Sequence, residues 1–457
     1  MKSTTPSPAA SGPTPDSPSP VPSGALLGLS RLALGAVNGA LSVLERLAWP
    51  IAPRRTERVA IFRIGMIGDV LVSLPAIHAV RRAHPDAELT LVSSPGRQGM
   101  PGARELLNGS SDIDRLLTYH AEDVATRRGR WALLRRLRAR RFDRVYVLPP
   151  ELTRIRTEFR NLAFWRLAGA RWVRGFAVHN ARCLPQPLAT AHHHGSHFRP
   201  EWRRQLELLS SRAGLPIGTS ADQRAELPRP VAVVELADRL EYEHDLEDRP
   251  LLALAPGAKL LHKRWPAERF GAVARSWIDA GGRVCVLGGA GDRELARTVR
   301  ESADRDVIDL TGATDLLTSA ELLRRATALV SNDTGTMHLG ATVGVPLVAI
   351  FSGQNRPDVW HPWPGGPQRI LREPVGCSPC FESDCPHAKA CLTRIDTDRV
   401  LRALSEVATW PGSEPPSEIE VDRPAGVASP ARQLSDSASS NPESSNSGPS
   451  NQRPARD

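Results

Sequence analysis

Hydrophobic and polar residues alternate in blocks along the middle of the chain, as in proteins that switch regularly between strands and helices. Apolar runs at residues 59–62, 89–92 and 145–148 are short and predict buried strands. Between the first two runs, residues 70–83 carry apolar side chains at helical spacing. A strand, a helix and a second strand in this order predict a parallel sheet with right-handed crossovers.

The same alternation returns after a break near residues 215–248. Residues 251–254 and 284–287 predict strands, each followed by a helical segment, and residues 319–351 predict helix, strand, helix and strand. Two such sets predict an α/β protein with two Rossmann-like domains that face a cleft. Ligands of such domains bind at the carboxyl ends of the strands.

Composition sets the limits of these domains. We expect the first Rossmann-like domain at residues 57–230 and the second at residues 245–408. Residues 1–23 and 411–457 are rich in Ser and Pro and hold few large apolar residues. Segments of this kind cannot build a core, so both ends are predicted to be disordered tails.

Residues 24–52 connect the first tail to the first domain and predict an amphipathic helix that ends at Pro50. Its apolar and polar residues fall on opposite faces at helical spacing: Leu26, Leu29, Val37, Leu41, Leu44 and Leu47 on one, and Arg31, Asn38, Ser42, Glu45 and Arg46 on the other. Two interpretations remain open. The helix lies on a membrane, with Trp49 at the level of the headgroups, or it packs on the protein's own surface.

The bulk composition is that of a globular protein, with 40% hydrophobic and 24% charged residues. Lys and Arg outnumber Asp and Glu by 59 to 50. This balance favours an acidic partner, such as a nucleotide, a phosphorylated glycan, a nucleic acid or an anionic membrane surface. The arginines of residues 127–144, grouped around Trp131, predict a solvated helix face or a contact with acidic lipid phosphates. No secretory signal is evident, and no run of about eighteen apolar residues is free of polar ones, which predicts a cytoplasmic protein.

The first polar motif reads Arg-Ile-Gly-Met-Ile-Gly-Asp-Val and begins at Arg63. Gly65 and Gly68 allow the backbone to turn sharply after the first strand and to approach a ligand closely. Asp69 then falls at a helix N-terminus beside the cleft. It is either a helix cap, a position that Asp favours, or a catalytic carboxylate.

Basic residues follow the strand at 251–254. Lys259 and Lys263 lie between that strand and a helix that opens after Trp265 and Pro266. Lysines in this place neutralise phosphates as point charges, and the helix dipole adds a partial positive charge. A solvated loop with Trp265 as a packing anchor is the alternative, and the pattern favours phosphate contact.

The third motif, residues 331–338, reads Ser-Asn-Asp-Thr-Gly-Thr-Met-His and lies between a strand at 328–330 and a helix. The backbone N–H groups of residues 333–336 predict an anion-binding nest at the helix N-terminus. An ordinary capping box is the alternative. Two polar, Gly-containing helix starts in one domain favour a diphosphate ligand.

Four of the six cysteines lie close together, at Cys377, Cys380, Cys385 and Cys391. A Cys-x-x-Cys start is typical of zinc sites, but the later gaps are unusually compact for one. The cluster is therefore either a structural zinc site or a loop of reduced or disulfide-bonded thiols. Nothing in it indicates a catalytic thiol.

Together these motifs resemble those of glycosyltransferase family 9, the lipopolysaccharide heptosyltransferases. The strings Gly-x-x-Gly-Asp, Lys-x-Trp-Pro and Ser-Asn-Asp-Thr-Gly-x-Met-His occur in family order within residues 57–400. His197 and the segment 205–209 are similar to a further family segment. The resemblance implies a GT-B glycosyltransferase fold, with the acceptor on the first domain and the nucleotide-sugar on the second.

The resemblance also implies roles for single residues. Asp69 becomes the general base and Lys263 the residue that meets the donor phosphates, while Asp292 becomes a candidate for the ribose. The implied donor-binding set is Lys259, Asp292, Asp333, Thr334, Gly335, Thr336 and His338, and Gly65 and Gly68 form the acceptor-side loop. Residues 258–262 depart from the short hydroxyl residues of better-known members, which leaves the sugar open.

The implied function is an inverting transfer of a sugar, a heptose from ADP-heptose, onto a lipopolysaccharide-core or related lipid-linked glycan. No metal-binding Asp-x-Asp pattern follows a strand, so we expect no catalytic cofactor. The enzyme would work in the cytoplasm, at the inner face of the inner membrane, without nucleic acid. Two alternatives remain. One is a non-catalytic nucleotide-sugar-binding scaffold at the membrane, which has no need of Asp69, and the other is a nucleotide-sugar epimerase of similar architecture.

Overall fold

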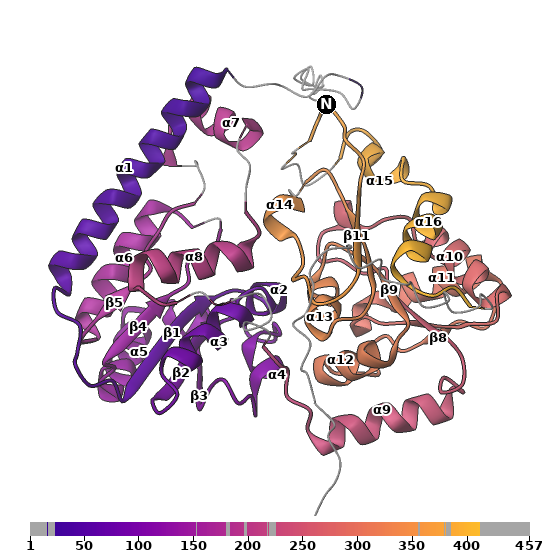
Figure 1. Ribbon diagram of the computed structural model, residues 1–457, viewed down its shortest axis with the longest axis horizontal. Helices are drawn as coiled ribbons and strands as arrows, with labels where there is room; N and C mark the ends of the chain where they lie inside the picture. Colours follow the sequence, from indigo (N-terminus) through magenta and orange to yellow (C-terminus); the bar gives the residue numbers. More distant parts are fainter. Residues whose placement is uncertain are drawn as a thin grey trace, which may run out of the picture. The chain divides into compact units, whose positions relative to one another are not determined.

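The computed structural model shows an α/β protein with two separate parallel sheets (Figure 1). It describes residues 16, 23–151, 153–179, 183–195, 199–216, 218, 225–354, 357–378, 380 and 385–411. His197 and the two predicted tails, apart from residues 16, 23 and 411, lie outside the described residues.

The first sheet holds five strands in the order β3-β2-β1-β4-β5, and every neighbouring pair is parallel. Its strands are β1 (Arg58–Ile64), β2 (Glu88–Ser94), β3 (Arg115–Thr118), β4 (Arg144–Val147) and β5 (Val173–Arg174). The prediction of a parallel sheet is confirmed, and with it the strands expected at 59–62, 89–92 and 145–148. The apolar side chains of β1 alternate between two cores, as the pleat of a strand requires.

One face of this sheet packs on α2 (Ile67–Leu71), α3 (Leu74–Ala83), α4 (Ala103–Leu107) and α8 (Glu201–Ala213). The other face packs on α5 (Arg127–Arg140) and α6 (Ile155–Leu167), where the buried Trp165 meets Phe62 edge to face at 5.5 Å. The prediction of a single helix at 70–83 is wrong in its first turn, where the structure has two helices, α2 and α3. The chain forms α2 three residues earlier and breaks at Ser73, whose hydroxyl donates to the carbonyl of Asp69 at 2.6 Å. Hydroxyl-to-carbonyl bonds of this kind compete with regular helix geometry.

The second sheet holds six strands in the order β11-β10-β9-β6-β7-β8, again all parallel. They are β6 (Leu251–Ala255), β7 (Arg283–Val286), β8 (Ile308–Asp309), β9 (Ala328–Asn332), β10 (Leu347–Phe351) and β11 (Gln368–Arg372). One face packs on α10 (Ala267–Asp279), α11 (Arg293–Ala303) and α16 (Thr397–Val407), and the other on α12 (Leu316–Arg325) and α13 (Gly335–Val343). Helix α9 (Val231–Glu243) lies in the expected break and packs on α12. The short helices α14 (Pro357–Trp360) and α15 (Ala390–Thr393) follow the last two strands of this sheet.

The predicted N-terminal helix is α1 (Gly24–Ala48), which lies along the outside of α6 and contacts α7 (Gln186–Gly195) (Figure 1). Its predicted faces are partly wrong, because two of its polar residues face the protein. Glu45 is buried, and its carboxylate accepts the N–H groups of Gly175 and Phe176 at 2.9 and 2.6 Å. The amide of Asn38 exchanges two hydrogen bonds with the backbone of Val178. Helical spacing identifies the apolar side of a helix. It cannot show that the backbone N–H groups of Gly175, Phe176 and Val178, which follow β5, need hydrogen-bond acceptors from that helix.

Candidate functional site

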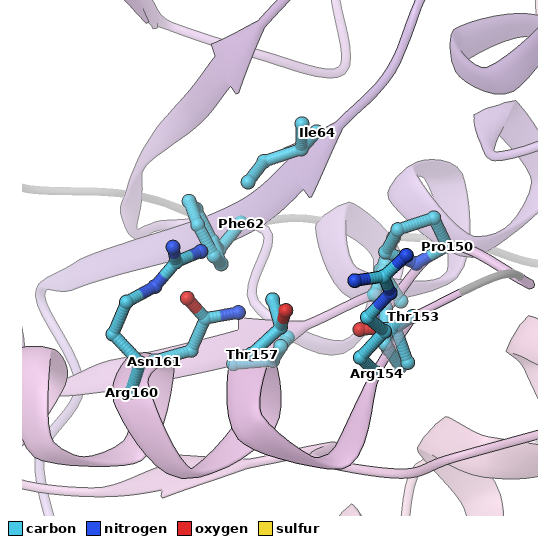
Figure 2. Close-up of a pocket in the computed structure, with 11 residues that line it drawn as sticks. Phe62, Ile64, Pro150, Thr153, Arg154, Thr157, Arg160 and Asn161 are labelled. Atoms are coloured by element: carbon cyan, nitrogen blue, oxygen red, sulfur yellow. The ribbon is translucent and has the colours of Figure 1, made fainter. Parts of the chain in front are cut away.

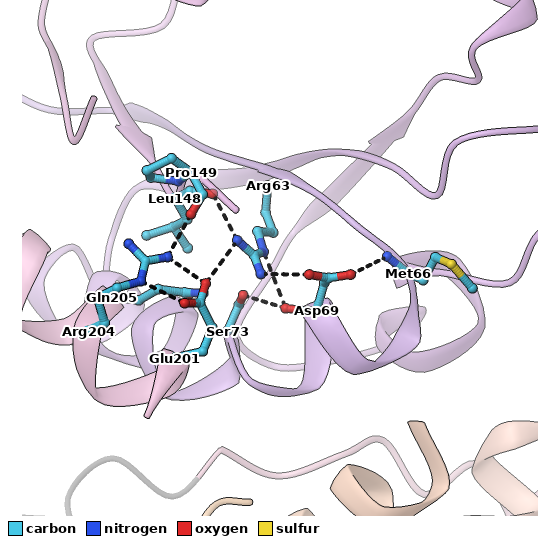
Figure 3. A network of polar contacts seen from close by, with 9 residues as sticks. All are labelled: Arg63, Met66, Asp69, Ser73, Leu148, Pro149, Glu201, Arg204 and Gln205. Carbon is cyan, nitrogen blue, oxygen red and sulfur yellow. Dashed lines mark hydrogen bonds and ion pairs between the residues drawn. The ribbon is translucent and has the colours of Figure 1, made fainter. Parts of the chain in front are cut away.

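The first candidate centre is the carboxylate of Asp69, just beyond the carboxyl end of β1 (Figure 3). Asp69 is the third residue of α2, and its Oδ2 accepts the N–H of Met66 at 3.0 Å. Its Oδ1 accepts a charged hydrogen bond from Nη2 of Arg63 at 3.1 Å. The side chain is 26% exposed, so the carboxylate is held on one side and open on the other. The helix-cap interpretation is therefore correct as far as it goes, and it leaves room for a ligand.

Arg63 is the buried cation behind this carboxylate. Its side chain is 1% exposed, and Nη1 lies 3.5 Å from Oε1 of Glu201 and donates to the carbonyl of Leu148 at 3.2 Å. Glu201 is fully buried and is also bound by Arg204 at 2.5 Å and Gln205 at 2.9 Å. These contacts join β1, β4 and α8 into one network around Asp69 (Figure 3). The sequence placed Asp69 but gave no sign of Glu201 or Arg204, because their pairing depends on contacts between distant segments.

The pKa values of two carboxylates in this network are shifted in opposite directions. Burial raises the pKa of Asp69 above its ordinary value, and the Arg63 guanidinium and the Met66 N–H oppose this effect only in part. Burial would also raise the pKa of Glu201, but the guanidiniums of Arg204 and Arg63 outweigh it and lower that pKa to about 2. Glu201 is thus a permanent anion, whereas Asp69 is the carboxylate with the greater affinity for a proton.

Gly65 is required by the close approach of the chain to Asp69. A Cβ at position 65 would lie 2.2 Å from Cβ of Asp69, closer than any real contact. A Cβ at Gly68 would make only ordinary contacts, with its nearest atom at 3.5 Å. Of the two predicted loop glycines, the packing therefore explains Gly65.

The second candidate centre is an ion pair at the carboxyl ends of β6 and β9. Nζ of Lys263 lies 2.8 Å from Oδ2 of Asp333, and the side chains are 13% and 4% exposed. The neighbouring Asn332 is buried and bridges two loops, since its Oδ1 accepts the N–H of Trp265 and its Nδ2 donates to the carbonyl of Pro256. Trp265 is itself buried, so it anchors this loop as well. For the loop that carries Lys263 and Trp265, the sequence leaves phosphate contact and packing as alternatives. The structure shows that Trp265 does pack as an anchor.

The N-terminus of α13 lies at the same strand ends. The helix begins at Gly335 with Thr334 as its cap residue, so the N–H groups of its first turn have no partner within the helix. The expected nest is shorter than predicted, because the N–H of Asp333 donates to the carbonyl of Ile350 at 3.1 Å and extends the sheet. The hydroxyl of Thr334 is buried without a hydrogen-bond partner among the described residues. Thr336 lies in the first turn and is half-buried.

His338, in contrast, lies inside the fold. Its ring is 4% exposed and packs edge to face on Trp360, with the ring centres 6.1 Å apart. Burial lowers the pKa of His338 to about 4, so the imidazole is neutral near pH 7. A neutral, covered ring cannot neutralise a phosphate, and we therefore expect His338 to support α13 by packing.

The other two predicted donor residues differ in their surroundings. Asp292 accepts the N–H of Gly289 at 3.1 Å and covers Gly257 so closely that a Cβ there would lie 2.6 Å from its carboxylate. It thus caps the turn after β7 and still keeps 22% of its side chain exposed. Lys259 lies in an exposed position, and its Nζ is 3.2 Å from Sδ of Met66.

A cavity of about 310 Å³ opens beside β1 and β4 on the side of α6 (Figure 2). Its wall is apolar along the strands and carries arginine, threonine and asparagine side chains from α6 and the turn before it. The lining residues are Phe62, Ile64, Val147, Leu148, Pro149, Pro150, Thr153, Arg154, Thr157, Arg160 and Asn161. Because Leu148 and Pro149 also accept hydrogen bonds from Arg63 and Arg204, the cavity adjoins the network that holds Asp69. No motif in the sequence indicates this cavity.

The cysteine cluster does not form a recognisable metal centre in the part of the chain that the structure describes. No group of three or more His, Cys, Asp or Glu side chains there is placed to hold a metal ion. The described cysteines form no disulfide. Burial raises the pKa of Cys377 and of Cys391 and keeps both as neutral thiols near pH 7. The zinc interpretation therefore gains no support from these residues.

Two parallel α/β sheets with polar centres at their strand ends are the architecture of the GT-B fold. The chain belongs to glycosyltransferase family 9 (heptosyltransferase), whose model matches residues 130–391, more than half of its length.

Curated relatives agree with this assignment. The lipooligosaccharide heptosyltransferase 2 of Haemophilus ducreyi is 37% identical over 112 residues, which cover 23% of this chain and 32% of that protein. The lipopolysaccharide heptosyltransferase 2 of Salmonella typhimurium is 24% identical over 365 residues, covering 76% of this chain and 97% of the relative. In the alignments at 30% identity or more, the chain spans less than half of the relative's length.

Solved structures support the fold. A family 9 glycosyl transferase from Veillonella parvula superposes with a TM-score of 0.62 at 22% identity, covering 78% of this chain and 98% of that one. An Escherichia coli heptosyltransferase solved with ADP-2-deoxy-2-fluoro heptose gives a TM-score of 0.51 at 20% identity, covering 76% and 99%. The predicted GT-B architecture is thereby confirmed.

The buried network around Arg63 yields a prediction about stability. Replacing Glu201 by Gln should lower the free energy of unfolding at pH 7 by about 3–5 kcal/mol, because it removes the buried carboxylate that pairs with both Arg63 and Arg204. The folded-state pKa of Glu201 is depressed, so its contribution is complete above the unfolded pKa near 4.5 and is lost as pH falls toward 2. The difference between wild type and variant, measured by urea unfolding, should therefore shrink over that pH range.

Glu207→Gln on the same helix is the matched control. Glu207 pairs with Arg199 and Arg203 at the surface, so its loss should cost about 1 kcal/mol or less. Equal stability of Glu201→Gln and wild type at pH 7 would show that the network does not hold the site together.

Proposed function

We propose that this protein is an inverting heptosyltransferase that moves a heptose from ADP-heptose onto a lipopolysaccharide-core glycan. The observation that carries the proposal is the partly exposed Asp69 carboxylate, held in place by Arg63 and by the Met66 N–H at the end of β1. The relatives named above are heptosyltransferases by name, and one solved structure of the fold holds an ADP-heptose analogue. Both facts support heptose as the sugar and ADP as the leaving group.

In this proposal Asp69 acts as the general base. Its Oδ2 or Oδ1 takes the proton of an acceptor hydroxyl, and the hydroxyl oxygen forms a bond to the anomeric carbon of the donor. The bond from that carbon to the diphosphate breaks on the opposite face, and the electron pair leaves with ADP, so the configuration inverts. A carboxylate whose pKa is raised by burial is a stronger base than an ordinary aspartate, and Arg63 fixes its orientation.

Lys263 and the start of α13 form the proposed donor-phosphate site. The lysine is already held by Asp333, so the carboxylate positions the cation and the ammonium meets the phosphate. The first-turn N–H groups of α13 and the unpartnered Thr334 hydroxyl supply neutral donors at the same strand ends. The charge that grows on the departing ADP is thus met by groups that are in place before the reaction. Gly335 and Thr336 contribute through their backbone, Lys259 is a second phosphate contact, and Asp292 remains the candidate for the ribose.

The cavity beside β1 is the proposed acceptor site. It adjoins the Asp69 network and offers the guanidiniums of Arg154 and Arg160 above an apolar floor (Figure 2). Guanidinium groups bind carboxylates and phosphates through two parallel hydrogen bonds. An anionic sugar of the acceptor fits this combination of charge and shape.

Asp69→Asn tests the base. The variant should lose about 10²–10⁴-fold in transfer rate and keep its affinity for ADP, because only proton removal is affected. In wild type the rate should fall as pH drops through the raised pKa of Asp69, since the base must be ionised. The measurements are steady-state kinetics across pH and calorimetric titration with ADP.

The exposed Asp86, replaced by Asn, is the control for loss of one negative charge in the same domain. Transfer by Asp69→Asn within about threefold of wild type would rule out Asp69 as the base. Absence of transfer by wild type would instead favour the non-catalytic scaffold.

Lys263→Met tests the donor site. Loss of the ammonium removes charge compensation for the leaving diphosphate, so kcat should fall by about 10²–10³-fold and donor KM should rise. Lys389→Met, at the start of α15, is a matched control that should leave both constants unchanged. Unchanged donor KM and kcat in Lys263→Met would show that the lysine serves only its pair with Asp333.

Arg160→Gln tests the acceptor site. The acceptor KM should rise by about 10–100-fold, the loss expected for one hydrogen bond to a charged group, while the donor KM stays the same. Arg156→Gln, exposed on the same helix but outside the cavity, is the control. A rise in donor KM instead, or no change in either constant, would place the acceptor elsewhere.

A further inference from the structure

The outer face of α1 is apolar and uncovered. Five residues of the helix, Leu29, Leu32, Val43, Leu44 and Leu47, are between 36% and 73% exposed, and Ile51 just beyond the helix is 79% exposed. The positions between them on this face are Ala and Gly, which are exposed as well. Isolated exposed apolar side chains are common on soluble proteins, but a continuous stripe along a helix of 25 residues marks an interaction surface.

The inner face of the same helix is fixed to the fold. Leu34 and Leu41 are buried against Val178, and Asn38 and Glu45 bind the backbone that follows β5. Glu45 is the only acidic side chain in residues 24–56. Because it is buried, the exposed charges of this segment are all positive: Arg31 and Arg46 on the helix and Arg54 and Arg55 after it.

Helix α5 extends this character onto the neighbouring surface. Trp49, at the end of α1, shares its core cluster with the buried leucines of α5. The exposed side of α5 carries Trp131, 60% exposed, among arginines and without an acidic residue. Among the described residues none of these arginines forms an ion pair with a carboxylate. The nearest acids in sequence are Asp123, in the turn before the helix, and Asp143 after it, which is buried and pairs with Arg171.

We propose that α1 docks the protein on an anionic lipid bilayer, lying flat in the headgroup region with its outer face toward the acyl chains. A stripe of leucines bordered by arginines, with the exposed Trp131 on α5, matches both layers of such a surface. Trp49, predicted to lie at the level of the headgroups, is instead buried in the core beside α5. A second copy of this chain fits less well, because it would bring arginines against arginines with no exposed acid to compensate them. The lipid-bound face lies on the same side of the first sheet as α6, which lines the proposed acceptor cavity.

The helix is long and apolar enough to cross a membrane by length and composition, and it is the one such helix among the described residues. The contacts of its inner face argue for the flat orientation instead. Crossing would remove the Glu45 carboxylate from two backbone N–H groups and place it in hydrocarbon. An unpaired carboxylate in that environment is strongly unfavourable.

Vesicle flotation of the full chain tests the proposal without any substrate, so its outcome is independent of the proposed catalytic function. Wild type should float with vesicles of phosphatidylcholine and phosphatidylglycerol and bind more weakly to phosphatidylcholine alone. The variant Leu29→Gln/Leu32→Gln/Leu47→Gln should lose about tenfold or more in partitioning, because each leucine no longer gains from burial in lipid. Arg31→Gln/Arg46→Gln should lose mainly the preference for the anionic vesicles.

Val231→Gln/Tyr242→Gln is the matched control, since both residues are more than 70% exposed on α9 of the second sheet. It should float like wild type. Circular dichroism and the melting temperature should show that the leucine variant is folded, as expected for exposed positions.

Three results would overturn the proposal. The first is that the leucine variant floats as well as wild type. The second is that wild type binds no vesicle and instead forms a dimer, detected by light scattering, that the leucine variant does not form. The third is resistance of the bound protein to extraction by alkaline carbonate, which would show a spanning helix; release by carbonate supports the flat orientation.

Discussion

Parallel pairing of every strand is the constraint on which the rest of this protein depends. In a parallel sheet all carboxyl ends lie at one edge, so segments far apart in sequence must end beside one another there. The ends of β1 and β4 bring Arg63 next to the carbonyl of Leu148, and the ends of β6 and β9 bring Lys263 next to Asp333. The polar centre of each sheet is thus formed by loops that are distant in sequence and that meet only because the strands before them are parallel.

Much of this could be predicted from the sequence, because the relevant signals are local. Short apolar runs gave the strands, and glycines after a strand gave the position of Asp69. The failures all involve contacts between distant segments. Nothing near Glu201 indicates that it binds Arg63, nothing near Ile350 indicates that its carbonyl takes the N–H of Asp333, and helical spacing could not show that Glu45 faces inward.

The two polar centres follow the same electrostatic logic with opposite signs. In the first sheet a buried cation holds the carboxylate that would accept a proton, and in the second a buried carboxylate holds the cation that would meet a phosphate. In both cases the buried partner is the one that substrate cannot reach. A charge fixed in this way needs little reorganisation when a ligand arrives, which is the property that electrostatic catalysis requires.

The attachment of α1 has a consequence for the way the chain is made. Its inner face is completed by backbone groups that lie 130 or more residues further along the sequence, at Gly175, Phe176 and Val178. At cellular rates of synthesis, roughly 5–20 residues per second, those groups leave the ribosome on the order of ten seconds after the helix does. During that interval the newborn chain presents an apolar helix with both faces uncovered. The segment that will cover its inner face does not yet exist, so the fold offers the helix no partner of its own.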